Sequence, residues 1–210
     1  MPLVNKLHWR YATKKFNRDK KVPEENITEL LKGVNLAPSS YGLQPYKVLV
    51  VHSNEIKKKL REVSYHQAQI VDGSHIFIFA AKKDISEREV DEYINRIAQV
   101  REVPHSELKD FKQSIQNTLD VMSDSEKLQW AEKQAYLGLG VLLALCTDMK
   151  IDACPMEGFE NEKYNQILDL DSEGYHAAVI AAVGYRRDDD DYAKLAKVRK
   201  ELDDFVDLRY

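Results

Sequence analysis

The sequence predicts one domain, residues 1–210, of the α+β or α/β class, with about four core strands flanked by helices. Two observations lead to this prediction. A long apolar stretch at residues 130–159 is typical of a buried central helix followed by a short strand. Apolar segments at 46–52, 76–81 and 175–185 have the length and composition of buried strands. No repeat, low-complexity tract or linker divides the chain, so a single core is expected.

The stretch at 130–159 is the least polar long segment, so its helix should be covered on most sides. Gly138 and Gly140 each weaken a helix by about 1 kcal/mol relative to Ala, which indicates that another group approaches the backbone closely. The pattern then shortens to a brief buried strand, and Pro155 and Gly158 bracket the loop PMEGF that follows. Loops that leave a strand end inside the core often carry ligand-binding groups, which makes PMEGF a candidate site.

Aromatic and basic residues are interleaved before Pro23. Arg10 and Lys14 are spaced i and i+4, so on one helical turn both could contact a single phosphate. Such a pair is more often a solvated surface. A helix is expected to begin at Pro23, with two glutamates in its first turn, and to end before Pro38.

A rigid polar loop at residues 38–45 precedes the strand at 46–52. Its hydroxyls and backbone amides suit an anionic or heteroaromatic ligand, although most loops of this composition are only connections. Asn54 is predicted to be the N-cap of the next helix, and the four cations within residues 57–61 are interpreted as its solvated face.

Two further helical regions are expected in the second half of the chain. Residues 86–125 are charged and weakly periodic, which predicts one or two exposed helices, broken near Pro104, that project from the core. Residues 161–168 have the pattern of a short helix. The projecting region is the segment least explained by the core fold.

Charged residues dominate the C-terminal part. The aspartates at 188–191 are interpreted as an exit into solvent, because adjacent carboxylates on one segment rarely converge on a single metal ion. No metal site is therefore predicted. The tail adds a second basic pair, Lys197 and Arg199.

Composition excludes several classes of protein. A net charge of −4 gives no general attraction to nucleic acid, so nucleic-acid binding is disfavoured. No apolar run approaches the roughly 20 residues of a membrane span, and the N-terminus lacks a signal-peptide core. Cys146 and Cys154, without metal-site or redox spacing, are expected to be reduced structural thiols. These observations predict a cytoplasmic protein without a membrane partner.

Six motifs in order identify a known family. They are RYATKKF from residue 10, APSSYGLQPYKVLVV from 37, DGSHIFIF from 72, KQAYLGLGVLLAL leading into PMEGF, AVGYR from 182 and KVR from 197. In this order and spacing the chain resembles the oxygen-insensitive FMN-dependent nitroreductase family. The resemblance spans nearly the whole chain and is weakest at residues 84–125.

The resemblance implies an α+β fold with a central, mostly antiparallel sheet of about four to five strands, in an intertwined homodimer with two FMN molecules at its interface. It implies that cations hold the FMN phosphate and the polar edge of the flavin, that a loop reaches across from the other subunit, and that the PMEGF backbone faces the ring near N5. The implied cofactor-binding residues are Arg10, Tyr11, Ala12, Lys14, Pro38, Ser39, Ser40, His66, Gln69, Pro155, Met156, Glu157, Gly158, Lys197 and Arg199.

Three positions depart from the family pattern. Ala12 stands where members often have a hydroxyl residue, His66 where an Asn often contacts the pyrimidine side of the flavin, and Gln69 where some members carry Lys. The resemblance therefore leaves Lys14 as the cation at the N1 edge, with the catalytic role of stabilising the reduced flavin.

The function that the resemblance implies is an NAD(P)H-dependent flavin nitroreductase or oxidoreductase. NAD(P)H, the co-substrate, would reduce FMN, and a small electron-poor acceptor such as a nitroaromatic, quinone or enone would then be reduced in a ping-pong mechanism. Two alternatives stay open: a divergent branch of the fold with other flavin chemistry, and a flavin-binding or regulatory protein with little turnover.

Overall fold

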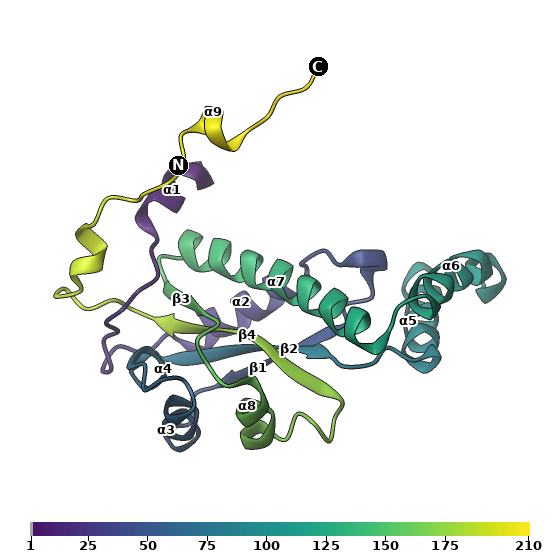
Figure 1. Ribbon diagram of the computed structural model, residues 1–210, viewed down its shortest axis with the longest axis horizontal. Coiled ribbons are helices and arrows are strands. Elements are labelled where there is room, and N and C mark those ends of the chain that lie inside the picture. Colours follow the sequence, from purple (N-terminus) through teal and green to yellow (C-terminus); the bar gives the residue numbers. More distant parts are fainter. Residues whose placement is uncertain (1) are drawn as a thin grey trace.

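The computed structural model describes residues 2–210, which form one sheet with helices on both of its faces (Figure 1). The strands are β1 (Tyr46–Val51), β2 (His75–Lys82), β3 (Asp152–Met156) and β4 (Tyr175–Gly184). The α-helices are α1 (Leu3–Trp9), α2 (Glu24–Asn35), α3 (Asn54–Glu62), α4 (Gln69–Asp72), α5 (Glu87–Arg101), α6 (Lys109–Asp120), α7 (Asp124–Asp148), α8 (Asn161–Leu168) and α9 (Leu202–Phe205). Short 3₁₀ helices are η1 (Ser40–Gly42), η2 (His105–Leu108) and η3 (Asp191–Lys194).

The sheet has the strand order β1-β2-β4-β3, and every neighbouring pair is antiparallel. Residue Val48 of β1 pairs with Phe79 of β2, and Ile78 of β2 pairs with Ile180 of β4. The antiparallel pairing resolves the predicted class as α+β, and the expectation of about four core strands is confirmed.

Successive side chains of β2 point to opposite faces, and both faces are buried. Phe77 and Phe79 lie in one apolar cluster with side chains of α2 and α7. Ile76 and Ile78 lie in a second cluster with side chains of α3, α4 and α8. Burial on both faces explains why this strand is a continuous apolar run in the sequence instead of an alternating one.

Helix α7 is the central helix that the apolar stretch predicts. It begins at a capping box in which the Ser123 hydroxyl accepts from the Glu126 N–H and the Glu126 carboxylate accepts from the Ser123 N–H. The expectation that it is covered on most sides is wrong for one face, where Tyr136 is 40% and Leu137 is 48% exposed. Of the two predicted close contacts, Gly138 lies against the sheet, whereas Gly140 has open space beside it. The helix therefore presents an uncovered apolar face.

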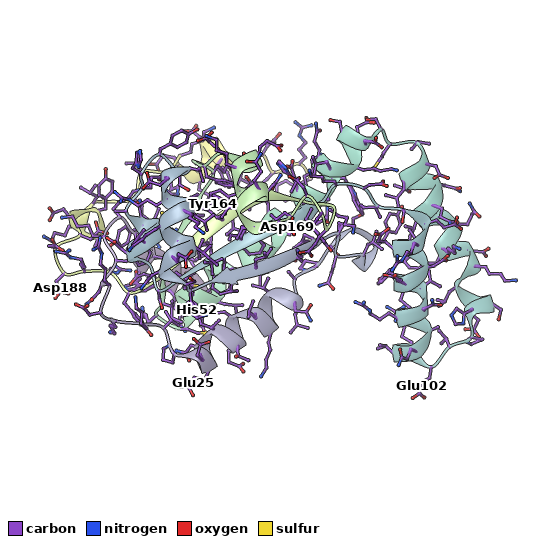
Figure 2. All side chains as sticks on the ribbon, turned by 90° about the horizontal axis from the view of Figure 1, so that it is seen from below. Glu25, His52, Glu102, Tyr164, Asp169 and Asp188 are labelled. Atoms are coloured by element: carbon purple, nitrogen blue, oxygen red, sulfur yellow. The ribbon has the colours of Figure 1, made fainter. Side chains whose placement is uncertain are left out.

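Helices α5 and α6 form the expected projection from the core, with a break that includes Pro104. Their apolar residues form a separate cluster that includes Ile94 and Ile115. Figure 2 shows Glu102 at the tip of this projection and Asp188 at the opposite end of the molecule. None of the helices in residues 2–210 is both long and apolar enough to cross a membrane.

Two local expectations around α3 are corrected by the structure. Ser53, not Asn54, is the N-cap, and its hydroxyl accepts from the Ile56 N–H at 3.5 Å. Lys57 is fully buried, because its ammonium group donates to the carbonyls of Val71 (3.1 Å) and Gly73 (2.7 Å) at the end of α4. Burial lowers the pKa of Lys57 to about 8.

The contact between Gly138 and the Tyr46 hydroxyl gives a stability prediction. Among residues 2–210, the Tyr46 hydroxyl is the one buried side-chain polar atom without a hydrogen-bond partner. A Cβ added at Gly138 would lie 2.7 Å from this oxygen and 3.1 Å from the Phe79 ring. Overpacking should cost about 1–3 kcal/mol, and the better helix propensity of Ala offsets about 1 kcal/mol of it, so we expect Gly138→Ala to lower the free energy of unfolding by up to about 2 kcal/mol.

Tyr46→Phe removes a buried hydroxyl that has no partner, so it should leave stability unchanged or raise it. In the double variant, Tyr46→Phe should restore most of the stability lost in Gly138→Ala. Urea unfolding of the two single variants and the double variant measures this coupling. If the two changes in the free energy of unfolding simply add in the double variant, position 138 does not contact the Tyr46 hydroxyl.

Candidate cofactor site

Residues 10–16 run along the end of the sheet. Ala12 forms an isolated parallel bridge with Ala153 of β3, and Phe16 forms an antiparallel bridge with Arg186, just beyond β4. This segment contains no helix and only isolated bridges, so contacts with neighbouring elements must fix its course. Two buried carboxylates supply many of them.

The first is Asp152, at the start of β3 and 4% exposed. Its carboxylate accepts from the backbone N–H of Arg186 (2.9 Å), from the Arg186 Nε (2.7 Å) and from the Thr13 hydroxyl (3.4 Å). The Arg186 guanidinium also lies over the rings of Trp9 (4.2 Å) and Tyr11 (4.5 Å). This buried ion pair joins the start of β3 and the residue after β4 to the N-terminal segment.

The second carboxylate is Asp190, which is 1% exposed. Its Oδ2 accepts from the Tyr11 hydroxyl (2.7 Å) and from the backbone N–H groups of Lys14 (2.8 Å) and Lys15 (3.0 Å). Burial alone would raise the pKa of Asp190, but these hydrogen bonds stabilise the charged form and hold the pKa below its ordinary value.

Asp190 corrects the interpretation of the aspartate run as wholly solvated. Asp188, Asp189 and Asp191 are exposed, and Figure 2 shows Asp188 at the edge of the molecule. Asp190 points inward because the N-terminal segment offers it three donors. No group of three or more His, Cys, Asp or Glu side chains within residues 2–210 could hold a metal ion.

The segment fixed by Asp190 brings predicted site residues from both ends of the chain together. The Lys197 ammonium group donates to the carbonyl of Arg10. Burial and the nearby charge of Arg199 lower the pKa of Arg10, and burial, Arg10 and Arg199 lower the pKa of Lys197. Within the described residues, no carboxylate forms an ion pair with Arg10, Lys197 or Arg199. We call these three residues the cation cluster; it concentrates positive charge locally in a protein of net charge −4.

Lys14 lies four residues after Arg10 on the same segment. Its ammonium group is 5.7 Å from the centre of the Tyr192 ring. Burial raises the pKa of the Cys154 thiol, and the positive charges of Lys14 and Arg10 oppose this rise. Ala12, which lies between these two cations in the chain, forms the bridge to Ala153 of β3. Cys146 and Cys154 are both buried free thiols, as expected.

The first two residues of PMEGF, expected to lie in a loop, form the end of β3, and the turn begins at Glu157. Pro155 and Met156 pair with Ala181 and Ile180 of β4. The Glu157 carboxylate accepts from the Tyr136 hydroxyl of α7 at 2.6 Å. The Glu157 carbonyl accepts from the Phe159 N–H at 2.9 Å, which closes a tight turn. Within residues 2–210, the N–H of Gly158 has no acceptor. A free backbone donor therefore lies at the end of a buried strand.

Neither His66 nor Gln69, two of the positions that depart from the family pattern, contacts this loop. His66 is exposed, and its Nδ1 lies 3.3 Å from the Glu62 carboxylate. Gln69 is buried at the start of α4. The residue that contacts the loop is Gln67, whose Nε2 donates to the carbonyl of Gly158 at 2.7 Å. In the sequence, only its position directly after His66 marks Gln67.

The predicted loop Pro38, Ser39 and Ser40 lies elsewhere on the chain. The N–H of Ser40 donates to Gln134 in the middle part of α7 at 2.8 Å, whereas Lys6 of α1 pairs with Asp148 at the C-terminal end of α7. Fourteen residues of helix span about 21 Å. Figure 1 shows α1 near the C-terminal end of α7. Within a single chain, this loop and the cation cluster are therefore far apart.

An antiparallel sheet enclosed by helices, with unpaired cations and a free glycine amide near opposite ends of one strand, defines the architecture as α+β. The chain belongs to the Nitroreductase family, whose profile matches residues 7–185.

Similar proteins cover almost the whole chain. A Staphylococcus haemolyticus protein, provisionally named an NAD(P)H nitroreductase, is 31% identical over 98% of this chain and 96% of its own length. The major NAD(P)H-flavin oxidoreductase of Aliivibrio fischeri is 28% identical over 99% of this chain and 98% of its own. The solved FMN complex of an Exiguobacterium sibiricum protein has a TM-score of 0.83 at 20% identity, covering 100% of this chain and 98% of that one.

The hydrogen bonds of Asp190 predict a stability loss with a defined pH dependence. Asp190→Asn removes the charge from an acceptor of three bonds, so we expect the free energy of unfolding at neutral pH to fall by about 1–3 kcal/mol. Because the folded pKa is lowered, the wild-type contribution is complete above the ordinary aspartate pKa of about 3.9 and is lost as pH falls through the folded pKa.

Urea unfolding of wild type and variant at neutral and at acid pH tests this, and the difference between them should shrink in acid. Asp188→Asn, at an exposed position of the same run, is the control and should change stability little. A pH-independent difference would show that the charge of Asp190 is not what stabilises the segment.

Proposed function

We propose that this protein is an NAD(P)H-dependent flavin oxidoreductase that binds FMN and reduces small electron-poor acceptors. The observations that carry the proposal are the cation cluster, which has no carboxylate partner, and the free N–H of Gly158, which lies just beyond the end of β3. Membership of the Nitroreductase family and the relatives named for NAD(P)H-flavin chemistry support it.

The residues at the site suit the parts of FMN. Guanidinium and ammonium groups are the preferred partners of a phosphate, so Arg10, Lys197 and Arg199 are assigned to it. Lys14, held by its backbone bond to Asp190, is assigned to the polar edge of the flavin, where positive charge favours the reduced form. Gly158 offers a backbone donor without a side chain that would hinder close approach. The backbone around Tyr11, Ala12, Pro155, Met156 and Glu157 completes the proposed pocket.

When bound, FMN supplies the redox chemistry, taking hydride from NAD(P)H in one half-reaction and reducing an acceptor in the other. The protein holds the cofactor and sets the charge around it, and no acid–base triad is required. A solved enone reductase of fatty-acid metabolism has a TM-score of 0.82 with this chain at 18% identity, which keeps enones among the candidate acceptors beside nitroaromatics and quinones.

We also propose that the active form is a homodimer. The loop at residues 38–40 is separated from the cation cluster by most of α7, so a second copy could supply it to the same site. The uncovered apolar face of α7 and the exposed apolar residues Leu202 and Phe205, on a tail that leaves the body, support an extensive contact between copies (Figure 1). His66 and Gln69 stay candidates for flavin contacts in that assembly. Free buried thiols and the use of NAD(P)H favour a cytoplasmic location.

The test of the proposed function is a steady-state assay of NADH and NADPH oxidation by the purified protein, with nitroaromatic, quinone and enone acceptors. Acceptor-dependent oxidation by a protein that copurifies with FMN is expected. Yellow protein without oxidation would favour the alternative of a flavin-binding or regulatory protein, and colourless protein that takes up no FMN would refute the proposal.

Loss of one phosphate contact should weaken cofactor binding more than turnover. A charge-assisted hydrogen bond contributes about 1.5–3 kcal/mol, so Arg199→Ala should raise the FMN dissociation constant about ten- to a hundredfold. Turnover of the FMN-saturated variant should change little, because the phosphate is remote from the reacting atoms. Fluorescence titration gives the affinity. Arg209→Ala, also in the exposed tail, is the control, and equal effects of both variants would place Arg199 outside the site.

If the uncovered face of α7 lies in the homodimer interface, a charge introduced there should disrupt the dimer. Leu137→Asp should shift the protein to a monomer in sedimentation and weaken FMN binding at the same time, because the site is shared. Val121→Asp, at an apolar position that is 82% exposed on the α5–α6 projection, should leave the dimer intact. A wild-type monomer that retains one FMN per chain would contradict the shared site.

A further inference from the structure

The turn that exposes the Gly158 N–H is held by a side chain that no assigned role uses. Gln67 donates from Nε2 to the carbonyl of Gly158 at 2.7 Å and to the carbonyl of Ser64 at 3.1 Å. Both acceptors are carbonyl oxygens, so only the amide nitrogen of Gln67 can face them. The orientation of the carboxamide is therefore fixed by its surroundings, and both of its N–H groups are used.

The loop that carries Gln67 is itself rigidly attached. The Glu160 N–H donates to the Val63 carbonyl at 2.9 Å, and the Ser64 and Tyr164 hydroxyls lie 2.8 Å apart in the core. The two residues before Gln67, Tyr65 and His66, have φ angles of 52° and 54°, a left-handed conformation that is unfavourable for residues with a Cβ.

Two successive left-handed residues persist only where neighbouring contacts determine them, and such strain gathers at functional sites. Here it has a geometric result. It reverses the chain after α3, so that the side chain of Gln67, and not that of His66, faces the PMEGF turn.

From these contacts we infer that Gln67 is a positioning residue of the cofactor site. Its carboxamide clamps the Gly158 carbonyl to the Ser64 carbonyl, so the turn of residues 157–159 is fixed before the cofactor arrives and the Gly158 N–H keeps one direction. The inference rests on the proposed function, because it assigns this N–H to the flavin. Pre-organisation of a donor increases affinity by reducing the ordering cost of binding.

The glutamate variant tests the clamp through pH. Gln67→Leu removes both donors and should weaken FMN binding about two- to tenfold, the worth of one ordinary hydrogen bond. Gln67→Glu has the same shape but places a carboxylate against two carbonyl oxygens, so at neutral pH it should bind FMN no better than Gln67→Leu. Its carboxyl pKa should be raised there, and the protonated acid can again donate to Gly158.

The measurement is the FMN dissociation constant of wild type, Gln67→Leu and Gln67→Glu across pH, each expressed relative to wild type at the same pH. All three proteins contain His66, Glu62 and Glu157, so any pH dependence that these residues cause is divided out of the ratio. The ratio for Gln67→Glu should approach one in acid, while that for Gln67→Leu stays constant. Circular dichroism at each pH establishes that the proteins are folded.

Tyr164→Phe is the matched control, since it removes a different tie of the same loop and leaves Gln67 in place. It should keep FMN affinity within about twofold of wild type. A loss equal to that of Gln67→Leu, or Gln67 variants that bind FMN like wild type at every pH, would overturn the clamp. Wild type that binds no FMN would instead refute the proposed function, and the clamp with it.

Discussion

The buried carboxylate of Asp190 is the contact on which the arrangement of the site depends. Residues 10–16 lack regular structure, and a charged acceptor that binds Tyr11, Lys14 and Lys15 gives them one course along the sheet. Asp152 adds a second fixed point through Arg186. Removing either carboxylate would leave buried donors unpaired, which costs more than the bonds contribute. The fold therefore uses two acidic groups to place a set of cations.

The folded chain keeps the residues of the cation cluster close together although their positive charges repel one another. Each lowered pKa, of Arg10 and of Lys197, reports an environment in which the charged form is disfavoured by burial and by like charges. In the proposed function, a bound phosphate would relieve that repulsion, so the folded chain would favour binding before any new contact is counted. The same logic applies to Gly158, where a fixed turn keeps a backbone donor free.

Elements with a strong local signal could be predicted from the sequence. The buried strands, the helix α8 at 161–168 and the break near Pro104 follow from periodicity and turn residues and need no tertiary information. The errors fall where tertiary contacts select one member of a uniform run. Lys57 and Asp190 are buried because a helix end and a backbone segment offer them partners, and nothing in their neighbours distinguishes them. Gln67 faces the site because of two left-handed residues that composition does not indicate.

The central claim is that the cation cluster holds the phosphate of FMN, and the most direct measurement compares FMN with riboflavin, which has the same ring system without the phosphate. Two or more charge-assisted contacts, each contributing about 1.5–3 kcal/mol, predict that FMN binds at least about a hundredfold more tightly than riboflavin. The preference should weaken as salt is added, because salt screens exposed charges. Equal affinity for the two flavins at low salt would contradict the account.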